Sequence, residues 1–149
     1  MSHPLLAAEA GVRHLLLGNE AIVRGALEAG INVVTCYPGT PSSEIPDTFH
    51  YLASCGRYRM EYSVNEKVAG ALAGAMSMTT MKHVGVNVAA DPLFTAAYVG
   101  LPGGFVLVSA DDPLCHSSQD EQDNRTYARF MGMPCFEPAT AQEAKDMTR

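Results

Sequence analysis

The sequence has 149 residues, 47% of them hydrophobic, which is enough apolar surface for one domain with a single core and too little chain for two. The formal net charge is −6 and the Lys and Arg residues do not cluster, so we expect no nucleic-acid partner. No run of about 18 apolar residues is present and residues 1–11 lack the features of a signal peptide, so we expect a cytoplasmic protein without a membrane segment.

The cysteines are widely spaced and form no Cys-x-x-Cys pair. They are Cys36, Cys55, Cys115 and Cys135. This spacing argues against a zinc or iron–sulfur site within the chain. It favours buried free thiols without disulfides in a reducing cytoplasm.

Residues 1–16 show no clear structural pattern, so we predict an N-terminal arm followed by one domain at residues 17–149. At the start of the domain, Asn19 is suited to cap a helix that Gly30 ends. The β-branched stretch at residues 31–37 then predicts a buried strand, of the kind found in parallel sheets that are covered on both faces.

The segment Pro-Gly-Thr-Pro-Ser-Ser, residues 38–43, follows the carboxyl end of this strand, where open parallel sheets bind ligands. Its glycine permits close approach to the backbone, and Thr40 adds a hydroxyl near a helix start. Because Pro46 is incompatible with a helix interior, we expect the next helix to begin at Ser43. The segment is also an ordinary helix entry, so by itself it identifies no ligand.

Residues 58–62 predict a short strand that leads to Glu66, in the first turn of a helix rich in small residues that ends near Ala75. Ser63 and Glu66 fit a capping box, in which the carboxylate accepts from a free backbone N–H. The alternative is a functional carboxylate on a helix that a flat cofactor ring can approach closely. Taken alone, the pattern favours the cap.

Residues 77–81 predict another strand, and Lys82 and His83 follow at its carboxyl end, ahead of a helix from about Asn87. Both side chains are candidates for contact with a bound anion or oxo group. The alternative is a solvated strand end, because no charge partner lies nearby in the sequence. The connection between the Glu66 helix and this strand, near Met76, is unusually short.

Residues 105–110 predict the most clearly buried strand of the chain, and residues 111–118 form a loop at its carboxyl end. A polar helix is predicted over residues 119–131. The acidic residues of this region and His116 have the spacing of neither a calcium loop nor a zinc helix pair, so we interpret them as a helix start and expect no metal site.

At the end of the sequence, residues 134–137 predict a further short strand, and Thr140 and Glu143 predict a capping box that opens a last helix. We expect this helix to continue in a longer polypeptide. The alternation of strands and helices predicts an α/β fold that is doubly wound around a mostly parallel sheet. Its carboxyl-edge loops, around Thr40, His83 and His116, should then converge with the helix start at Glu66.

Four motifs together resemble the alpha subunit of indolepyruvate ferredoxin oxidoreductase. They are Gly18-Asn-Glu-Ala-Ile22, Tyr37-Pro-Gly-Thr-Pro-Ser-Ser-Glu44, Val64-Asn-Glu-Lys-Val68 with Met81-Lys-His-Val-Gly85, and Asp111-Asp-Pro113 with His116-Ser-Ser-Gln119 and Glu121-Gln-Asp-Asn-Arg125. The resemblance covers residues 17–149 and corresponds to the N-terminal domain of that family, which is similar to the pyrimidine-binding domain of thiamine diphosphate enzymes.

The resemblance implies that Glu66 is catalytic and binds the cofactor: its carboxylate would hydrogen-bond to the aminopyrimidine ring of thiamine diphosphate and promote loss of the thiazolium proton. It also implies that Thr40 faces the carboxylate of a 2-oxo acid. With this resemblance, the remaining loop residues become site candidates. They are His83, His116 and Ser117 for substrate binding, and Pro38, Gly39 and Lys82 for cofactor binding.

The sequence lacks a Gly-Asp-Gly loop for the diphosphate and Mg²⁺, and it lacks the cysteine set of iron–sulfur clusters. We therefore expect a complementary diphosphate-binding domain or subunit to hold Mg²⁺, and iron–sulfur clusters to lie elsewhere in the complex. The resemblance implies an enzyme that converts an aryl-pyruvate such as indolepyruvate and coenzyme A to acyl-CoA, CO₂ and reduced ferredoxin. It also implies a dimeric assembly, and we expect this chain to be unable to complete the reaction alone.

Two alternatives stay open at this point. A split, non-oxidative 2-oxo-acid decarboxylase of the sulfopyruvate decarboxylase type also has a short pyrimidine-domain subunit. A degenerate domain retained for assembly is the second alternative, and the short link near Met76 is its motivation.

Overall fold

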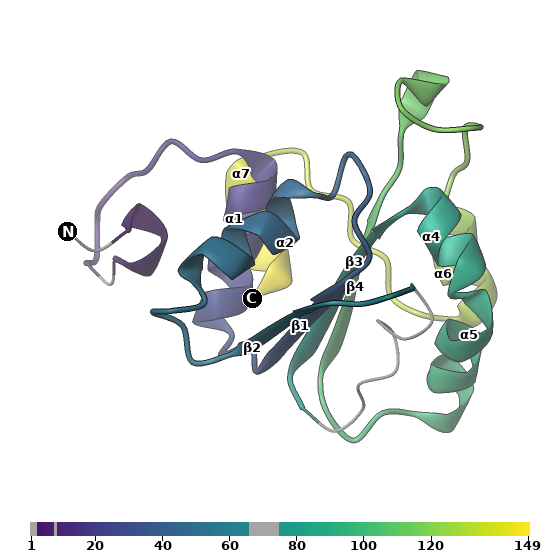
Figure 1. Cartoon of the computed structure of the whole chain (residues 1–149), viewed down its shortest axis with the longest axis horizontal. Coiled ribbons are helices and arrows are strands. Elements are labelled where there is room, and N and C mark those ends of the chain that lie inside the picture. Colours follow the sequence, from purple (N-terminus) through teal and green to yellow (C-terminus); the bar gives the residue numbers. More distant parts are fainter. Residues whose placement is uncertain (1–2, 8, 66–74) are drawn as a thin grey trace.

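The computed structural model describes residues 3–7, 9–65 and 75–149, and these form a parallel sheet covered by helices on both faces (Figure 1). The sheet has the strand order β2-β1-β3-β4, and every neighbouring pair is parallel. The strands are β1 (Val33–Cys36), β2 (Arg59–Tyr62), β3 (Ser77–Lys82) and β4 (Phe105–Ala110). This arrangement confirms the predicted doubly wound α/β fold.

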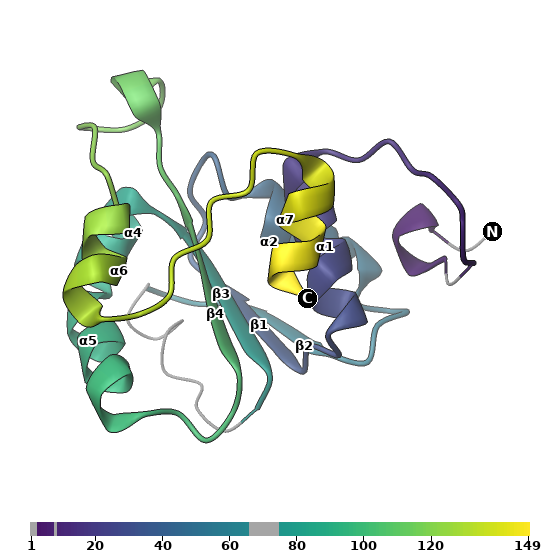
Figure 2. The same cartoon turned by 180° about the vertical axis from the view of Figure 1, so that it is seen from behind.

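The helices form two layers, one on each face of the sheet (Figure 2). On one face lie α1 (Gly18–Glu28), α2 (Glu44–Leu52) and α7 (Ala141–Thr148), and on the other lie α4 (His83–Val88), α5 (Ala90–Val99) and α6 (Arg125–Met131). Two short 3-10 turns, Pro4–Leu6 and Pro113–Cys115, complete the described elements. No helix of the described part is long and apolar enough to span a membrane.

The strands bury alternate side chains in two separate clusters, as the period of a pleated strand requires. Val34 and Met78 face the first cluster, together with Phe49 of α2. Met81 faces the second, together with Leu93 of α5. The sheet is therefore covered on both faces, which explains why its inner strands β1 and β3 have no exposed residue.

The first helix begins before its predicted cap, Asn19. Leu17 is the N-cap residue, and its backbone N–H donates to Glu20 Oε2 at 2.8 Å. The prediction that Asn19 caps this helix is wrong, because Asn19 lies inside the first turn and its side chain bonds to the loop before α2. The helix ends as predicted, with Gly30 at a φ of +77°.

The start of α2 confirms the prediction made from Pro46. Ser43 is the N-cap residue, and Pro46 lies in the first turn, where a backbone N–H has no intrahelical acceptor. The last helix is also confirmed. Thr140 Oγ1 accepts from the N–H of Glu143 at 3.2 Å, and Glu143 Oε2 accepts from the N–H of Ala139 at 2.8 Å.

Three predictions about later elements are wrong. Helix α4 begins directly at His83 and not near Asn87, because Gly85 and two valines conceal the helical pattern of its first turn. The polar stretch 119–124 is a loop, since its side chains bond to other segments instead of supporting a helix. Residues 134–137 pair with no strand: they are exposed, and Pro134 has no N–H to donate.

Strand β4 is less buried than its sequence predicts. Five of its six residues have intermediate exposure and Ser109 is exposed. The reason is its position at the edge of the described sheet, where it pairs only with β3. The apolar residues of a strand show that it can be buried, but they do not show whether another segment covers that strand.

Part of the N-terminal arm contacts the domain. Leu5 is buried in the first cluster, and Arg24 of α1 donates hydrogen bonds to the carbonyls of Leu5 and Ala7, at 3.0 and 2.6 Å. The boundary at residues 16 and 17 stays a prediction. Glu66 and most of its predicted helix lie outside the described residues.

Candidate active site at the carboxyl edge

The segments that follow β1, β3 and β4 meet at the carboxyl edge of the sheet. The β1 loop, residues 37–43, connects β1 to α2, and the β4 loop, residues 111–124, connects β4 to α6 and rises above the sheet in Figure 1. No loop follows β3, because α4 starts immediately after Lys82. The side chains at the end of β3 therefore lie between the two loops.

Lys82 contacts both of these loops. Its Nζ donates a hydrogen bond of 2.7 Å to the carbonyl oxygen of Ser117 in the β4 loop. Its methylene groups lie against Gly39 in the β1 loop, where an added Cβ would approach Lys82 Cδ to 3.2 Å. Among the described residues, no carboxylate forms an ion pair with Lys82. Its positive charge is thus suited to an anionic ligand.

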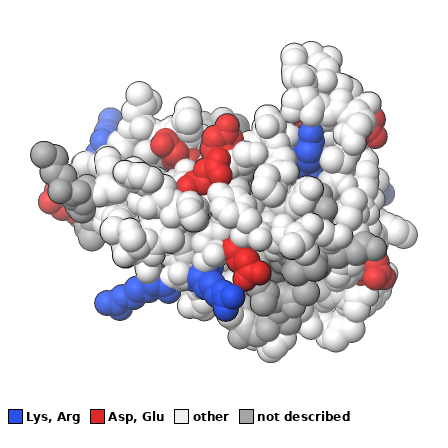
Figure 3. Space-filling view, viewed as in Figure 1, with Lys and Arg blue, Asp and Glu red and all other residues white. Residues whose placement is uncertain are grey.

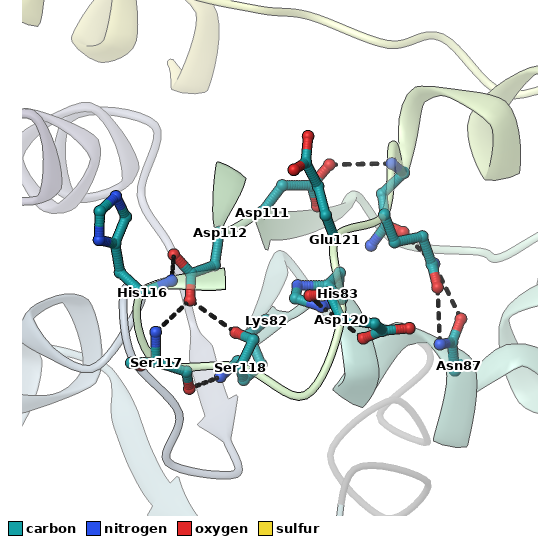
Figure 4. Close-up of polar contacts among 12 residues, drawn as sticks. Lys82, His83, Asn87, Asp111, Asp112, His116, Ser117, Ser118, Asp120 and Glu121 are labelled. Carbon is teal, nitrogen blue, oxygen red and sulfur yellow. Dashed lines mark hydrogen bonds and ion pairs between the residues drawn. The ribbon is translucent and has the colours of Figure 1, made fainter. Parts of the chain in front are cut away.

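Asp112 determines the path of the β4 loop. Its carboxylate is largely buried and accepts three hydrogen bonds, from the N–H of His116 at 3.2 Å, the N–H of Ser117 at 2.7 Å and the hydroxyl of Ser118 at 2.7 Å (Figure 4). The Ser118 hydroxyl and the Ser117 amide lower the pKa of this carboxyl group. The sequence-based interpretation as a helix start missed this role, although an Asp followed by serines is a known loop signal.

His83 is completely buried at the start of α4. Its Nε2 lies 3.1 Å from the carbonyl oxygen of Asp120 and 3.2 Å from Asp120 Oδ1. A carbonyl oxygen can only accept, so Nε2 carries a proton. The solvated strand end that was one interpretation of this segment is therefore wrong for His83.

Three buried polar atoms near this edge have no hydrogen-bond partner within the described part of the chain. They are His83 Nδ1 and the hydroxyl oxygens of Thr79 and Thr80 on β3. Buried polar groups are normally satisfied by protein, water or ligand. Thr79 and Thr80 are consecutive in β3, so their hydroxyls lie on opposite faces of the sheet. One ligand could therefore not contact both hydroxyls.

The remaining predicted residues are exposed on the loops. Thr40 and Pro38 lie on the β1 loop, in which the Ser42 hydroxyl donates to the carbonyl of Gly39 at 2.8 Å. His116 is exposed, and its imidazole points away from Lys82 in Figure 4. The structure thus brings Gly39, Lys82 and the backbone of Ser117 into contact, and leaves Thr40 and His116 at the rim.

A further polar cluster lies beneath the β1 loop, and sequence reasoning did not identify it. The hydroxyl of Tyr62 donates to Asp47 Oδ1 at 2.6 Å. Burial, and then this bond, raise the pKa of Tyr62, and burial with the nearby Asp47 charge raises the pKa of the Cys36 thiol from 9.0 to about 12. Both groups are protonated at neutral pH, so neither supplies an anionic nucleophile. The prediction of buried thiols holds for Cys36 and is wrong for Cys55, Cys115 and Cys135, which are exposed on the surface.

The charged side chains of the described residues form no metal centre, and those on the face shown in Figure 3 form no basic patch. In the regions that the structure covers, no group of three or more His, Cys, Asp or Glu residues could hold a metal ion. On the face shown in Figure 3, Lys and Arg side chains are dispersed. The site therefore rests on Lys82, the neighbouring backbone and the buried histidine.

Residues 24–149 match the family described as pyruvate flavodoxin/ferredoxin oxidoreductase, thiamine diphosphate-binding. The chain belongs to this family. The match extends over the whole sheet and all helices from the middle of α1 onward. It confirms the resemblance drawn from the four sequence motifs.

The curated relatives include proteins named Indolepyruvate oxidoreductase subunit IorA. The protein from Archaeoglobus fulgidus is 59% identical over 149 residues, covering 93% of this chain and 24% of the relative. The protein from Pyrococcus abyssi is 56% identical over 145 residues, covering 93% of this chain and 22% of the relative. The chain thus spans about a quarter of the length of these relatives.

A solved structure has the same fold. It is a 2-oxoglutarate:ferredoxin oxidoreductase from Magnetococcus marinus, with 2-oxoglutarate, coenzyme A and succinyl-CoA bound. The TM-score is 0.69 at 21% sequence identity, and the match covers 89% of this chain and 25% of that chain. At this identity the similarity establishes the fold and no more.

Proposed function

We propose that this chain is the pyrimidine-binding part of a thiamine diphosphate-dependent 2-oxo-acid:ferredoxin oxidoreductase that acts on aryl-pyruvates such as indolepyruvate. The complete enzyme would convert the 2-oxo acid and coenzyme A to acyl-CoA and CO₂, and would pass the released electron pair to ferredoxin. The observation that carries the proposal is the convergence of three segments on Lys82, in a chain of this family. The names of the IorA relatives support the aryl-pyruvate substrate.

The site residues divide into two groups in this proposal. Pro38, Gly39 and Lys82 contact the cofactor: the glycine permits close approach, and the ammonium group provides positive charge. The substrate-facing residues are Thr40, His83, His116 and Ser117. The hydroxyls of Thr40 and Ser117 and the imidazole of His116, on exposed loops, can donate to the carboxylate and oxo group of a 2-oxo acid. His83 is buried, and its Nδ1 can accept a hydrogen bond.

The described residues fit thiamine diphosphate together with its 2-oxo-acid substrate in two respects. The buried Nδ1 of His83 lacks a partner, and the Gly39 backbone leaves no room for a side chain beside Lys82. When bound, this cofactor supplies a nucleophilic carbanion that adds to the 2-oxo group and accepts the electrons of decarboxylation. The part of Glu66 is to accept a hydrogen bond from a protonated ring nitrogen and so keep the proton there.

The remaining chemistry belongs to other parts of the enzyme. We propose that a complementary diphosphate-binding domain or subunit holds the diphosphate and Mg²⁺, that iron–sulfur clusters lie elsewhere in the complex, and that the assembly is dimeric. The relatives are about four times longer than this chain, which leaves room for such domains.

The test uses the complete protein with all its subunits, indolepyruvate, coenzyme A and ferredoxin. We expect reduction of ferredoxin that requires coenzyme A and matches the CO₂ released. Aldehyde and CO₂ without ferredoxin reduction would instead identify a non-oxidative decarboxylase. Absence of turnover with every 2-oxo acid tested, in a complex that is assembled, would identify a degenerate domain.

A further inference from the structure

The backbone of Ser117 is hydrogen-bonded on both sides. Its N–H donates to Asp112 Oδ2 at 2.7 Å, and its carbonyl oxygen accepts from Lys82 Nζ at 2.7 Å. Figure 4 shows these bonds in sequence, from the carboxylate through the Ser117 backbone to the ammonium group. Asp112 lies just after β4, and Lys82 is the last residue of β3. Through these two bonds, the backbone of Ser117 connects the ends of two neighbouring strands.

Asp112 bonds to the β4 loop at several points. Leu114 and Cys115 have φ values of +66° and +53°, a left-handed conformation that non-glycine residues rarely adopt. Such a conformation persists where the surrounding contacts determine it. Leu114 N–H donates to Glu121 Oε2 at 3.1 Å, and Cys115 N–H donates to the carbonyl oxygen of Asp112 at 3.1 Å. Directly after them, His116, Ser117 and Ser118 bond to the carboxylate of Asp112, which is 8% exposed.

The Asp112 carboxylate is not paired with a positively charged side chain in the described structure. None of the ion pairs formed by the described residues includes Asp112. An ionised carboxylate accepts several hydrogen bonds at once, whereas the amide of an asparagine would turn one donor toward the donors of the loop. The three bonds therefore need an aspartate at this position.

We propose that Asp112 is a positioning residue for Lys82: by fixing the Ser117 carbonyl, it sets where the ammonium group of Lys82 lies at the carboxyl edge. The relevance of this position to catalysis rests on the proposed function. Lys82 is otherwise a flexible side chain with a single hydrogen-bond acceptor from the β4 loop, so loss of that acceptor leaves the ammonium group free to reorient.

The first test measures amide hydrogen exchange in residues 113–118 of the 149-residue chain, and it needs no cofactor. In Asp112→Asn we expect the His116 amide, the Ser117 amide or both to exchange about tenfold faster or more, because an NH₂ donor replaces one of the two acceptor oxygens. Asp111→Asn is the matched control: Asp111 accepts from the N–H of Asn124 at 2.9 Å, at the other end of the loop. Unchanged exchange at His116 and Ser117 in Asp112→Asn would contradict the proposal.

The second test is a double-mutant cycle in the complete enzyme, with the Michaelis constants for thiamine diphosphate and for the 2-oxo acid as readouts. We expect Asp112→Asn to raise the same constant as Lys82→Met, and the double variant to be no worse than the more impaired single variant. Independent effects that multiply would overturn the proposal. In the control pair, Asp111→Asn with Lys82→Met, the effects of the two substitutions on the Michaelis constant should multiply.

Two outcomes separate this inference from the proposed function. If Lys82→Met alone changes neither constant, the proposed cofactor role of Lys82 fails, while hydrogen exchange still decides whether Asp112 fixes the loop. If Asp112→Asn does not fold, Ser118→Ala removes only one of the three bonds to the carboxylate. For Ser118→Ala we then expect a smaller increase in amide exchange. Its effect on the Michaelis constant should again not multiply with that of Lys82→Met, and effects that multiply would overturn the proposal.

Discussion

The side-chain amide of Asn19 donates hydrogen bonds to Glu44 Oε2 at 2.8 Å and to the carbonyl oxygen of Pro41 at 3.1 Å. Asn19 lies in the first turn of α1, and its two partners flank the end of the β1 loop that contains Thr40. Two of the motifs that identified the family in the sequence are thus in direct contact. This contact explains why an asparagine is present inside a helix, where its intrinsic propensity is poor.

We expect Asn19→Ala to loosen the β1 loop more than it destabilises the domain. The loss of two partly exposed hydrogen bonds should cost about 0.5–1.5 kcal/mol of unfolding free energy. The Michaelis constant of the complete enzyme for the 2-oxo acid should rise, because the Thr40 loop is less well positioned. Gln142→Ala is the control, since it also removes an amide that bonds to a carboxylate, but on α7. Equal Michaelis constants in the two variants would contradict this role.

The sequence predicted the elements whose residues signal their structure locally. Strands β1, β3 and β4 follow apolar or β-branched runs, and β2 follows an alternation of polar and apolar residues. The starts of α2 and α7 follow from Pro46 and Thr140. Because carboxyl ends of parallel strands share one edge, the location of the candidate site followed as well. The same topology was sufficient to predict that Lys82 lies between two loops.

The side-chain bonds that organise the loops could not be predicted. Asn19 and Asp112 have side chains suited to a helix start, and in both cases the group bonds to a loop instead. Local patterns cannot distinguish these uses, because the partner residues are fixed by the tertiary structure. The burial of His83 was missed for the same reason: its partner Asp120 is 37 residues away in the sequence.

Glu66 has two candidate roles that differ in their effect. Loss of a helix cap costs about 0.5–2 kcal/mol of stability, whereas loss of the pyrimidine contact should abolish turnover in a folded protein. We expect Glu66→Gln in the complete enzyme to lose nearly all ferredoxin reduction while its melting temperature changes by only a few degrees. Ser63→Ala, which removes the other member of the predicted box, should keep its activity. Full activity of Glu66→Gln would leave only the capping role.

The ion pairs of Glu28 predict how stability depends on pH. Glu28 in α1 bonds to Arg24 at 2.8 Å, and to Lys145 and Arg149 of the C-terminal segment at 3.2 and 3.3 Å. The Arg24 bond contributes most to lowering the pKa of Glu28 from 4.5 to about 2. Because the folded state has the lower pKa, the stabilisation is fully present above pH 4.5 and is lost as the pH falls toward 2.

Urea denaturation of the 149-residue chain at several pH values measures this effect. We expect the parent chain to have a higher denaturation midpoint than Glu28→Gln at neutral pH, and the difference to shrink on acidification below pH 4.5. Glu137→Gln is the control, because Glu137 is an exposed partner of Arg125 and contributes little. A difference between parent and Glu28→Gln that is constant with pH would exclude the ion pairs as its source.

The last prediction concerns thiamine diphosphate and the 149-residue chain without its partners. Most of the charge of the cofactor lies in the diphosphate, whose binding commonly depends on Mg²⁺ and on backbone N–H groups at a helix start. The start of α2 is the nearest helix start to the β1 loop, but Glu44 and Asp47 place two carboxylates in its first turn. These negative charges oppose a phosphate group there.

Lys82 then offers a single positive charge, which should be insufficient to offset the entropy lost when the cofactor is captured. We expect isothermal titration calorimetry to detect no saturable binding by this chain at about millimolar cofactor with Mg²⁺, and to detect binding by the complete protein under the same conditions. Tight binding by the 149 residues alone would mean that they contain a phosphate site. The acidic first turn of α2 would then have to be tested directly, by asking whether Glu44→Gln and Asp47→Asn strengthen that binding.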